Sequence, residues 1–166
     1  MRICGVDPGL QCTGYGVLDV EGPRMRLVAT GVFRSSAADP LAVRVQAIHT
    51  GVAALLRATR PDCLALEALY SHYAHPATAI LMGHVRGVIL LAAGAAGVPV
   101  SEYSATHVKK AVSGRGHAAK PQVQRMVQML LNLPAPPEPD DATDALALAM
   151  AHAHALRAPR LVPVPA

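Results

Sequence analysis

The chain has 166 residues, the length of a single domain, so two domains are not expected. Hydrophobic residues make up 52% of it but aromatic residues only 3%, so the core should consist mainly of Ala, Val and Leu. The net charge of +4 favours an anionic partner such as nucleic acid. Three cysteines without a CxxC pair argue against a disulfide framework and a thiolate zinc site. The first residues have the pattern of a strand and not of a signal peptide, so a cytoplasmic protein is expected.

The first predicted strand, residues 2–7, ends on the carboxylate of Asp7 and is followed at once by a Pro-Gly turn. Residues 15–20 are its expected hairpin partner, and residues 26–33 a third antiparallel strand. The simplest interpretation of Asp7 is a strand-ending turn residue. Glycines at positions 9, 14 and 16 suggest another, in which uncovered backbone beside Asp7 lets an anionic ligand or a metal ion approach.

A second strand that ends on a carboxylate follows a helix. Helical spacing of apolar residues predicts the helix over residues 41–56, and residues 63–67 form a short buried strand that ends on Glu67. This order indicates a crossover connection, which makes the second strand parallel to the first. If the two are neighbours, Asp7 and Glu67 emerge at the same edge of the sheet, where open α/β folds bind ligands.

Residues 68–76 are predicted to form a loop beside this edge. Tyr70 either anchors the loop or has a functional role, and both interpretations stay open. His72 and His75 suggest a metal pair, but no neighbouring ligand completes it.

Residues 77–96 predict a long helix that is apolar nearly all round, apart from His84 and Arg86. Its purely apolar run is too short and too rich in glycine for a membrane span, so no membrane partner is expected. A helix with so little polar surface must be covered on both sides. It is either a core helix of one subunit or, with Gly83 and Gly87 permitting close approach, also the contact of a homodimer.

The second half of the chain predicts a strand at 98–102, helices at 105–112, 120–131 and 140–154, a basic loop at 113–117 and a Pro-rich connector at 134–139. A single domain over residues 1–156 and a disordered Pro-rich tail over 157–166 are expected. The only three lysines, Lys109, Lys110 and Lys120, lie in one segment together with Arg115.

Asp141 and Asp144 are three residues apart, so on a helix both side chains lie on one face, and that face can be turned to Asp7 and Glu67. Acids in a first helical turn also cap free N–H groups, and Asp140 is assigned only this role. Four clustered carboxylates are unfavourable without cations and offer the oxygen ligands that Mg²⁺ or Mn²⁺ prefers. Two such ions about 4 Å apart clamp a scissile phosphate for in-line attack by water.

Several motifs follow one another along the chain: Gly5-Val6-Asp7-Pro8-Gly9, Thr13-Gly14-Tyr15-Gly16, Leu66-Glu67, Arg86-Gly87, Glu102-Tyr103, Val108-Lys109, the helix start at 120–123, and Asp141-x-x-Asp144-Ala-Leu-Ala. With these motifs in this order, up to about residue 154, the chain resembles the RuvC family of bacterial Holliday junction resolvases. The resemblance implies a ribonuclease H-like α/β fold, with a mixed five-stranded sheet whose first three strands are antiparallel and with helices on both faces.

The resemblance also implies an enzyme of homologous recombination and DNA repair. Such an enzyme is a homodimer that nicks two strands of like polarity across a four-way DNA junction and leaves 5′-phosphate and 3′-hydroxyl ends. By position, Asp7, Glu67, Asp141 and Asp144 match the catalytic acids of the family, and they are expected to hold two Mg²⁺ or Mn²⁺ ions per subunit. The branch-migration proteins RuvA and RuvB are expected partners.

The resemblance extends to DNA-binding residues. Lys109 and Lys120 match basic residues near the scissile phosphate, and Arg115 of the same basic segment is expected to bind DNA with them. Tyr70 falls where the family has an aromatic residue, often Phe, that stacks on unpaired bases. The loop over residues 71–76 departs from the family pattern, so the resemblance predicts no base preference at the cut.

Three alternatives remain at this point. Another nuclease of the same fold would act on RNA–DNA hybrids or on ribosomal RNA precursors. An actin-like sugar kinase or ATPase also has an Asp-x-Gly motif on its first strand, but it needs a second domain for which this chain has no room. A non-catalytic module would bind junctions without nicking them.

Overall fold

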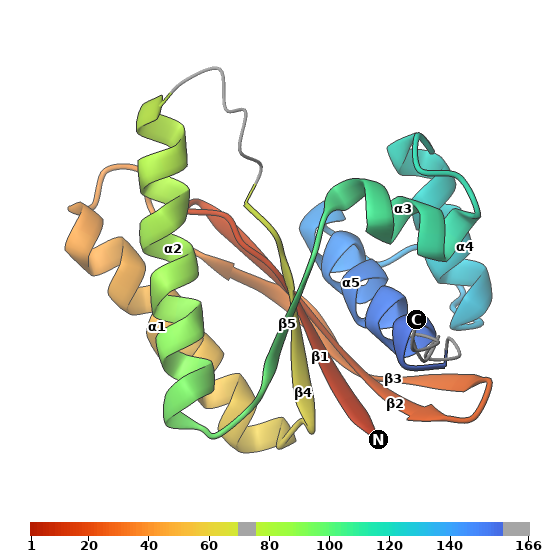
Figure 1. The fold of residues 1–166 in the computed structure, drawn as a ribbon. Coiled ribbons are helices and arrows are strands. Elements are labelled where there is room, and N and C mark those ends of the chain that lie inside the picture. The colour runs from red at the N-terminus through yellow and green to blue at the C-terminus, as the bar shows by residue number, and fades with distance from the viewer. Residues whose placement is uncertain (70–75, 158–166) are drawn as a thin grey trace, which may run out of the picture.

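The computed structural model describes residues 1–69 and 76–157. Five strands form one mixed sheet in the order β3-β2-β1-β4-β5, with helices on both faces (Figure 1). The strands are β1 (Arg2–Asp7), β2 (Cys12–Glu21), β3 (Arg24–Arg34), β4 (Cys63–Glu67) and β5 (Val100–Tyr103). The first three are antiparallel, whereas β1, β4 and β5 run parallel to one another. The predicted sheet is confirmed.

The register of β1 brings its terminal acid beside that of β4. Val6 pairs with Leu66 in parallel, so Asp7 and Glu67, each the next residue along its strand, emerge together at one edge. Both strands are central and have helices on both faces, which explains why they are almost purely apolar runs. The crossover therefore places the two acids as the sequence predicts.

α1 (Leu41–Thr59) and α2 (Pro76–Ala95) cover one face of the sheet (Figure 1). Their buried side chains, among them Val52, Val85 and Ile89, pack with Val6 and Leu66 of the central strands. This cluster is the core on that side, and it is built from aliphatic residues as the composition predicts.

α5 (Asp140–Arg157) lies on the opposite face, with α3 (Ala105–Ser113) and α4 (Lys120–Leu130) beside it (Figure 1). The helix packs directly on the strand backbone because the strands present glycines to it. A Cβ on Gly5 would lie 2.0 Å from the carbonyl oxygen of Ala145, and one on Gly14 would lie 1.9 Å from that of Asp141. These glycines fix how close the acids of α5 come to β1.

The expectation that the glycines near Asp7 leave backbone open to a ligand is wrong. At Gly14 and Gly16 the space is filled by α5, and a Cβ on Gly9 would lie 2.0 Å from the carbonyl oxygen of Cys12 within the turn. The glycines serve close packing of the chain on itself, and the cavity beside Asp7 is lined by other residues.

Two histidines of α5 tie the helix to its neighbours. The hydroxyl of Tyr103 at the end of β5 lies 2.8 Å from Nδ1 of His152, with which it shares a hydrogen bond. Nδ1 of His154 donates to the carbonyl oxygen of Ala111 in α3 at 3.0 Å. β5 and α3 are therefore fixed to the helix that carries Asp141 and Asp144.

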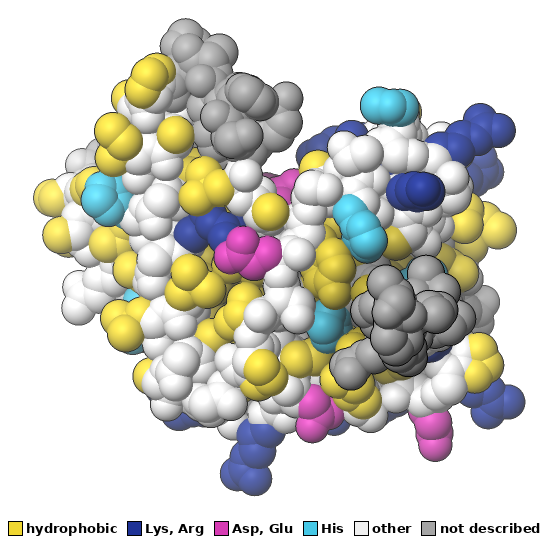
Figure 2. All heavy atoms as spheres, in the orientation of Figure 1, with side chains coloured by type: hydrophobic (Ala, Val, Ile, Leu, Met, Phe, Trp, Pro, Cys, Tyr) yellow, Lys and Arg dark blue, Asp and Glu magenta, His cyan; other side chains and the backbone are white. Residues whose placement is uncertain are grey.

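α2 is the one helix in the described part of the chain that is long and apolar enough, by length and composition alone, to cross a membrane. Only 28% of its most apolar stretch is buried. Hydrophobic side chains lie exposed along it (Figure 2), and Ile80 and Leu91 are each 62% exposed. One face of α2 is therefore a layer of the core, and the other is an apolar surface that the described residues leave uncovered.

Candidate active site

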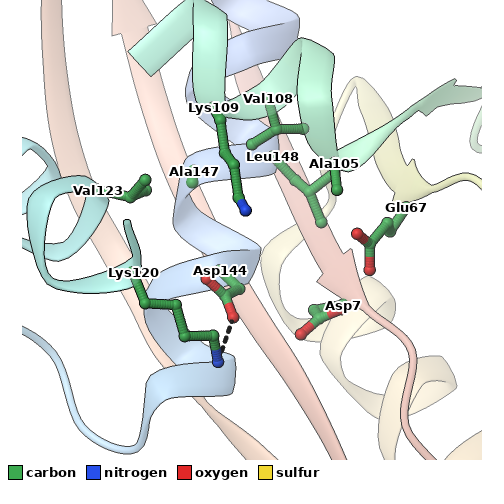
Figure 3. Close-up of a pocket in the computed structure, with 10 residues that line it drawn as sticks. All are labelled: Asp7, Glu67, Ala105, Val108, Lys109, Lys120, Val123, Asp144, Ala147 and Leu148. Atoms are coloured by element: carbon green, nitrogen blue, oxygen red, sulfur yellow. Dashed lines mark ion pairs between the residues drawn. The ribbon is translucent and has the colours of Figure 1, made fainter. Parts of the chain in front are cut away.

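A cavity of about 190 Å³ lies at the edge of the sheet where β1 and β4 end (Figure 3). Three of the predicted acids line it, Asp7 from β1, Glu67 from β4 and Asp144 from α5. Lys109 of α3 and Lys120 at the start of α4 line it from the other side. Aliphatic side chains complete the wall, and they are Ala105, Val108, Val123, Ala147 and Leu148.

The carboxyl groups of Asp7 and Glu67 lie near each other at the strand ends (Figure 3). Burial is the main reason why the pKa of Asp7 is raised far above its ordinary value, and the neighbouring carboxylate of Glu67 raises it further. Neighbouring carboxylates cannot all stay ionised at low cost, so without a cation the protonated form of Asp7 is favoured.

Asp144 lies across the cavity and is paired with a lysine. Nζ of Lys120 lies 3.1 Å from its Oδ2 and 3.7 Å from Oδ2 of Asp140. Burial alone would lower the pKa of Lys120, but the hydrogen bond and charge of Asp144 outweigh it, so the pKa is raised and the ammonium form is favoured. Asp140 also accepts a hydrogen bond of 2.7 Å from Gln124, so it links α5 to α4 beyond its expected role in the first helical turn.

Asp141 is set apart from the other three acids. It does not line the cavity but a neighbouring open groove with Arg34 and Glu138. Its charge still helps to raise the pKa of Asp7, and its backbone packs against Gly14, the partner of Asp7 in the sheet. Asp141 is therefore close to the cavity but not in its wall.

Cys12 is a neighbour of the site to which the sequence analysis gave no role. Burial is the main reason why the pKa of its thiol is raised, and the nearby carboxylate of Asp141 raises it further. The signal in the sequence was its position two residues before Gly14, which pairs with Asp7. The thiol therefore lies near the carboxylate of Asp141 beside the first strand.

Among the described residues, no three His, Cys, Asp or Glu side chains are already gathered as a metal-binding group. The chemistry of the donors nevertheless fits a divalent cation. Asp7, Glu67 and Asp144 are oxygen ligands of the kind that Mg²⁺ and Mn²⁺ prefer, and a proton and the ammonium group of Lys120 now offset their charge. A cation would replace the proton and would lower the pKa of Asp7.

The three described residues among the predicted DNA-binding residues do not all lie in the cavity. Lys109 and Lys120 point into the cavity (Figure 3). Arg115 is exposed in the loop between α3 and α4 and does not line the cavity. Tyr70, like the histidines at positions 72 and 75, lies outside the described residues.

Arg86 is a functional candidate that the sequence places in the apolar helix and in the Arg86-Gly87 motif, without assigning it a role in the site. It is buried against the sheet, with 6% of its surface exposed. Its guanidinium group donates to the carbonyl oxygen of Glu67 and, at 2.5 Å, to Oε1 of Glu102. The signal for such a role was the single arginine in an otherwise apolar helix, because a buried charge needs a partner.

The comparisons with known proteins agree with this arrangement. The sequence profile of the family described as "Crossover junction endodeoxyribonuclease RuvC" matches residues 3–152. The enzyme of that name from Rhodopirellula baltica is 51% identical over 87% of this chain and 81% of its own length. That from Brevibacillus brevis is 44% identical over 88% of this chain and 87% of its own.

Solved structures give the same result. The structure of Thermus thermophilus RuvC in complex with Holliday junction substrate is 39% identical, covers 95% of both chains and has a TM-score of 0.90. The yeast mitochondrial Holliday junction resolvase, 11% identical with a TM-score of 0.66 over 92% of this chain and 78% of its own, shares the fold alone. The ribonuclease H-like resolvase fold is confirmed, and the chain belongs to the RuvC family of crossover junction endodeoxyribonucleases.

Proposed function

We propose that this protein resolves Holliday junctions by symmetric, divalent-metal-dependent nicking of two strands of like polarity in DNA recombination and repair. The observation that carries the proposal is the meeting of Asp7, Glu67 and Asp144 in one cavity with Lys109 and Lys120. The relative from Thermus thermophilus, whose structure is of a complex with Holliday junction substrate, supports the choice of DNA.

In the proposed reaction the carboxylates of Asp7, Glu67 and Asp144 hold two Mg²⁺ or Mn²⁺ ions, and Asp141 assists from the neighbouring groove. Two ions held there would supply an activated water and would stabilise the leaving oxygen, so that an in-line attack would leave 5′-phosphate and 3′-hydroxyl ends. The chain itself orients the scissile phosphate with Lys109 and Lys120. Because lysines bind phosphate as point charges, they contribute affinity without sequence preference.

The proposal includes a homodimer formed through α2. Ile80, Gly83, Gly87 and Leu91 recur at spacings of three and four residues, so they share one face of the helix. No described residue lies within 4 Å of a Cβ placed on either glycine, which leaves room for a second helix to approach. A twofold dimer presents two identical sites to a four-way junction, and paired nicks follow from that symmetry.

The test compares cleavage of a four-way junction, an RNA–DNA hybrid and a linear duplex in Mg²⁺ or Mn²⁺, with the ends mapped. We expect wild type to nick the junction in two strands of like polarity. Asp7→Asn removes a ligand charge, so the cleavage rate should fall about 1,000-fold or more while junction binding in EDTA is retained. Asp39→Asn, at an exposed acid before α1, is the matched control and should cleave as wild type does.

Each alternative predicts a different result in the same experiment. Preference for the RNA–DNA hybrid would indicate another nuclease of this fold. Binding of the junction without nicking in either metal would indicate a binding module. Contact with RuvA and RuvB stays a prediction, which a pull-down with the purified proteins checks.

A further inference from the structure

Arg86 is the one buried arginine in the described part of the chain, and it lies beneath the candidate active site. It comes from the middle of α2 and crosses to the ends of two strands. One guanidinium nitrogen, Nη1, donates to the backbone carbonyl of Glu67, and another, Nη2, donates to the carboxylate of Glu102 in β5 at 2.5 Å. A single side chain thus joins a helix and two strands at one point.

Stability alone is a weak reason for such an arrangement. Burying a guanidinium group is costly, and a well-packed apolar residue of similar volume is often as stabilising as a buried ion pair. Glu102 is 47% exposed on its side chain, so water weakens its charge interaction with Arg86. The two hydrogen bonds that Arg86 donates are therefore better explained by the positions in which they hold the carbonyl group of Glu67 and the carboxylate of Glu102.

Of the two acceptor residues, Glu67 in β4 is the one whose side chain lines the cavity. Glu67 is the last residue of β4, and directly after it the Ala68 amide donates to the Tyr103 carbonyl oxygen at 2.8 Å, where the strand leaves the sheet. The carbonyl that Arg86 holds belongs to the same residue whose carboxylate faces Asp7. The guanidinium group therefore fixes the peptide plane from which that carboxylate projects.

We infer that Arg86, oriented by Glu102, is a positioning residue that sets the direction of Glu67 toward the metal ions. The inference rests on the role proposed above for Glu67. Arg86 does not line the cavity, so it acts only through the backbone of Glu67. Residues that orient metal ligands in this way commonly change metal affinity or activity about 10- to 100-fold when they are replaced.

The experiment uses Arg86→Lys, Glu102→Gln and a matched control, Arg26→Lys. Lysine keeps the positive charge but loses the planar fork that reaches both acceptors, whereas glutamine in place of Glu102 keeps an acceptor oxygen without the charge. Arg26 also pairs with an acid, Asp19 at 2.5 Å, but its side chain is 73% exposed and does not line the cavity. We expect Arg86→Lys to weaken Mn²⁺ binding about 10- to 100-fold by calorimetry, Glu102→Gln to weaken it less, and Arg26→Lys to leave it unchanged.

A double-mutant cycle separates positioning from a general loss of structure. If Arg86 acts through Glu67, adding Arg86→Lys to Glu67→Gln should weaken Mn²⁺ binding no further than Glu67→Gln alone. Additive losses, or full Mn²⁺ binding by Arg86→Lys, would overturn the inference. Junction binding in EDTA and the melting temperature are measured for every variant, and a fall in both for Arg86→Lys that matches its loss of Mn²⁺ binding would also overturn it.

The same protein preparations distinguish failure of this inference from failure of the proposed function. If wild type nicks the junction and Arg86→Lys does so at the same rate and metal concentration, Arg86 has no positioning role and the proposed function stands. If wild type binds Mn²⁺ but never nicks a junction, the proposed function fails, and the Mn²⁺ titrations of the variants still decide the role of Arg86.

Discussion

α5 and α2 cover opposite faces of one sheet and are both rich in small and apolar residues, yet they are buried to very different extents. Of the 18 residues of α5, an almost unbroken run from Ala142 to Ala153 is buried. Of the 20 residues of α2, five are buried, and its outer face is open. Apolar composition alone therefore does not predict which of the two helices is buried within a single subunit.

The position of the glycines explains the difference. Under α5 the glycines are in the strands, so the helix backbone comes into contact with β1 and β2 and its acids reach the strand ends. On α2 the glycines are in the helix itself, on the face turned away from the sheet, where no described part of the same chain approaches. The close approach of α5 to β1 and β2 therefore brings the carboxylates of α5 to the strand ends. The open space beside the glycines of α2 is suited to the approach of a second subunit.

The largest expected effect comes from breaking the close approach of α5. Gly5→Ala would put a Cβ 2.0 Å from the carbonyl oxygen of Ala145, so α5 has to move away from β1. We expect a loss of about 3 kcal/mol in the free energy of unfolding and loss of junction cleavage. Urea unfolding followed by circular dichroism measures the first quantity. Gly87→Ala, with open space around its Cβ, is the control and should not destabilise the monomer.

If Gly5→Ala and Gly87→Ala unfold at the same urea concentration, the different burial of α5 and α2 is not explained by how closely each helix packs on the sheet. In that case the strand glycines are not what lets Asp141 and Asp144 come close to Asp7.

An intermediate effect is expected from a charge on the open face of α2. Leu91 is 62% exposed in the single chain, so Leu91→Glu should leave the stability of the monomer nearly unchanged but place two carboxylates in the proposed dimer contact. We expect the dimer dissociation constant to rise about 100-fold, measured by sedimentation equilibrium. Met129→Glu, at a residue of α4 that is 67% exposed, is the control. A wild-type protein that is monomeric at micromolar concentration would contradict the expectation.

The smallest expected effect is on the free energy of unfolding, and it comes from the cost of burying the Asp7 carboxylate near the other acids. The raised pKa of Asp7 means that the folded protein binds this proton more tightly than the unfolded chain. This contribution to stability is fully present below pH about 4 and is lost as the pH rises through the raised pKa of the folded state. In metal-free buffer at pH 8, Asp7→Asn should therefore be more stable than wild type by about 1 kcal/mol, a rise of about 3 °C in melting temperature.

Adding Mg²⁺ should reverse that order. The ion stabilises wild type by binding to its folded state, whereas the Asp7→Asn variant lacks one of the ligand carboxylates and gains less from the same concentration of metal. Asp39→Asn, an exposed acid, should show neither effect. Equal melting temperatures of Asp7→Asn and wild type in metal-free buffer from pH about 4 to pH 8 would mean that burying the Asp7 carboxylate near the other acids does not lower the stability.

The meeting of Asp7 and Glu67 at one edge of the sheet was predictable because it depends on local sequence pattern and on the handedness of crossover connections. Short apolar runs that end on Asp7 and Glu67, with a helix between them, leave few other arrangements. The direction of Arg86 was not predictable, since a helix that is apolar all round does not reveal which side meets the sheet. The proximity of Cys12 to Asp141 depends on how closely α5 packs, and that is decided by tertiary structure.

The ion pair between Lys120 and Asp144 has a consequence for the order of events in the proposed reaction. One ammonium group cannot fully neutralise both this carboxylate and an incoming phosphate. If DNA draws Lys120 away as proposed, Asp144 would be left with an unbalanced charge, and its attraction for a cation would rise once the substrate is in place. By thermodynamic linkage a bound cation would strengthen the binding of DNA to the same degree, so the two ligands would bind cooperatively.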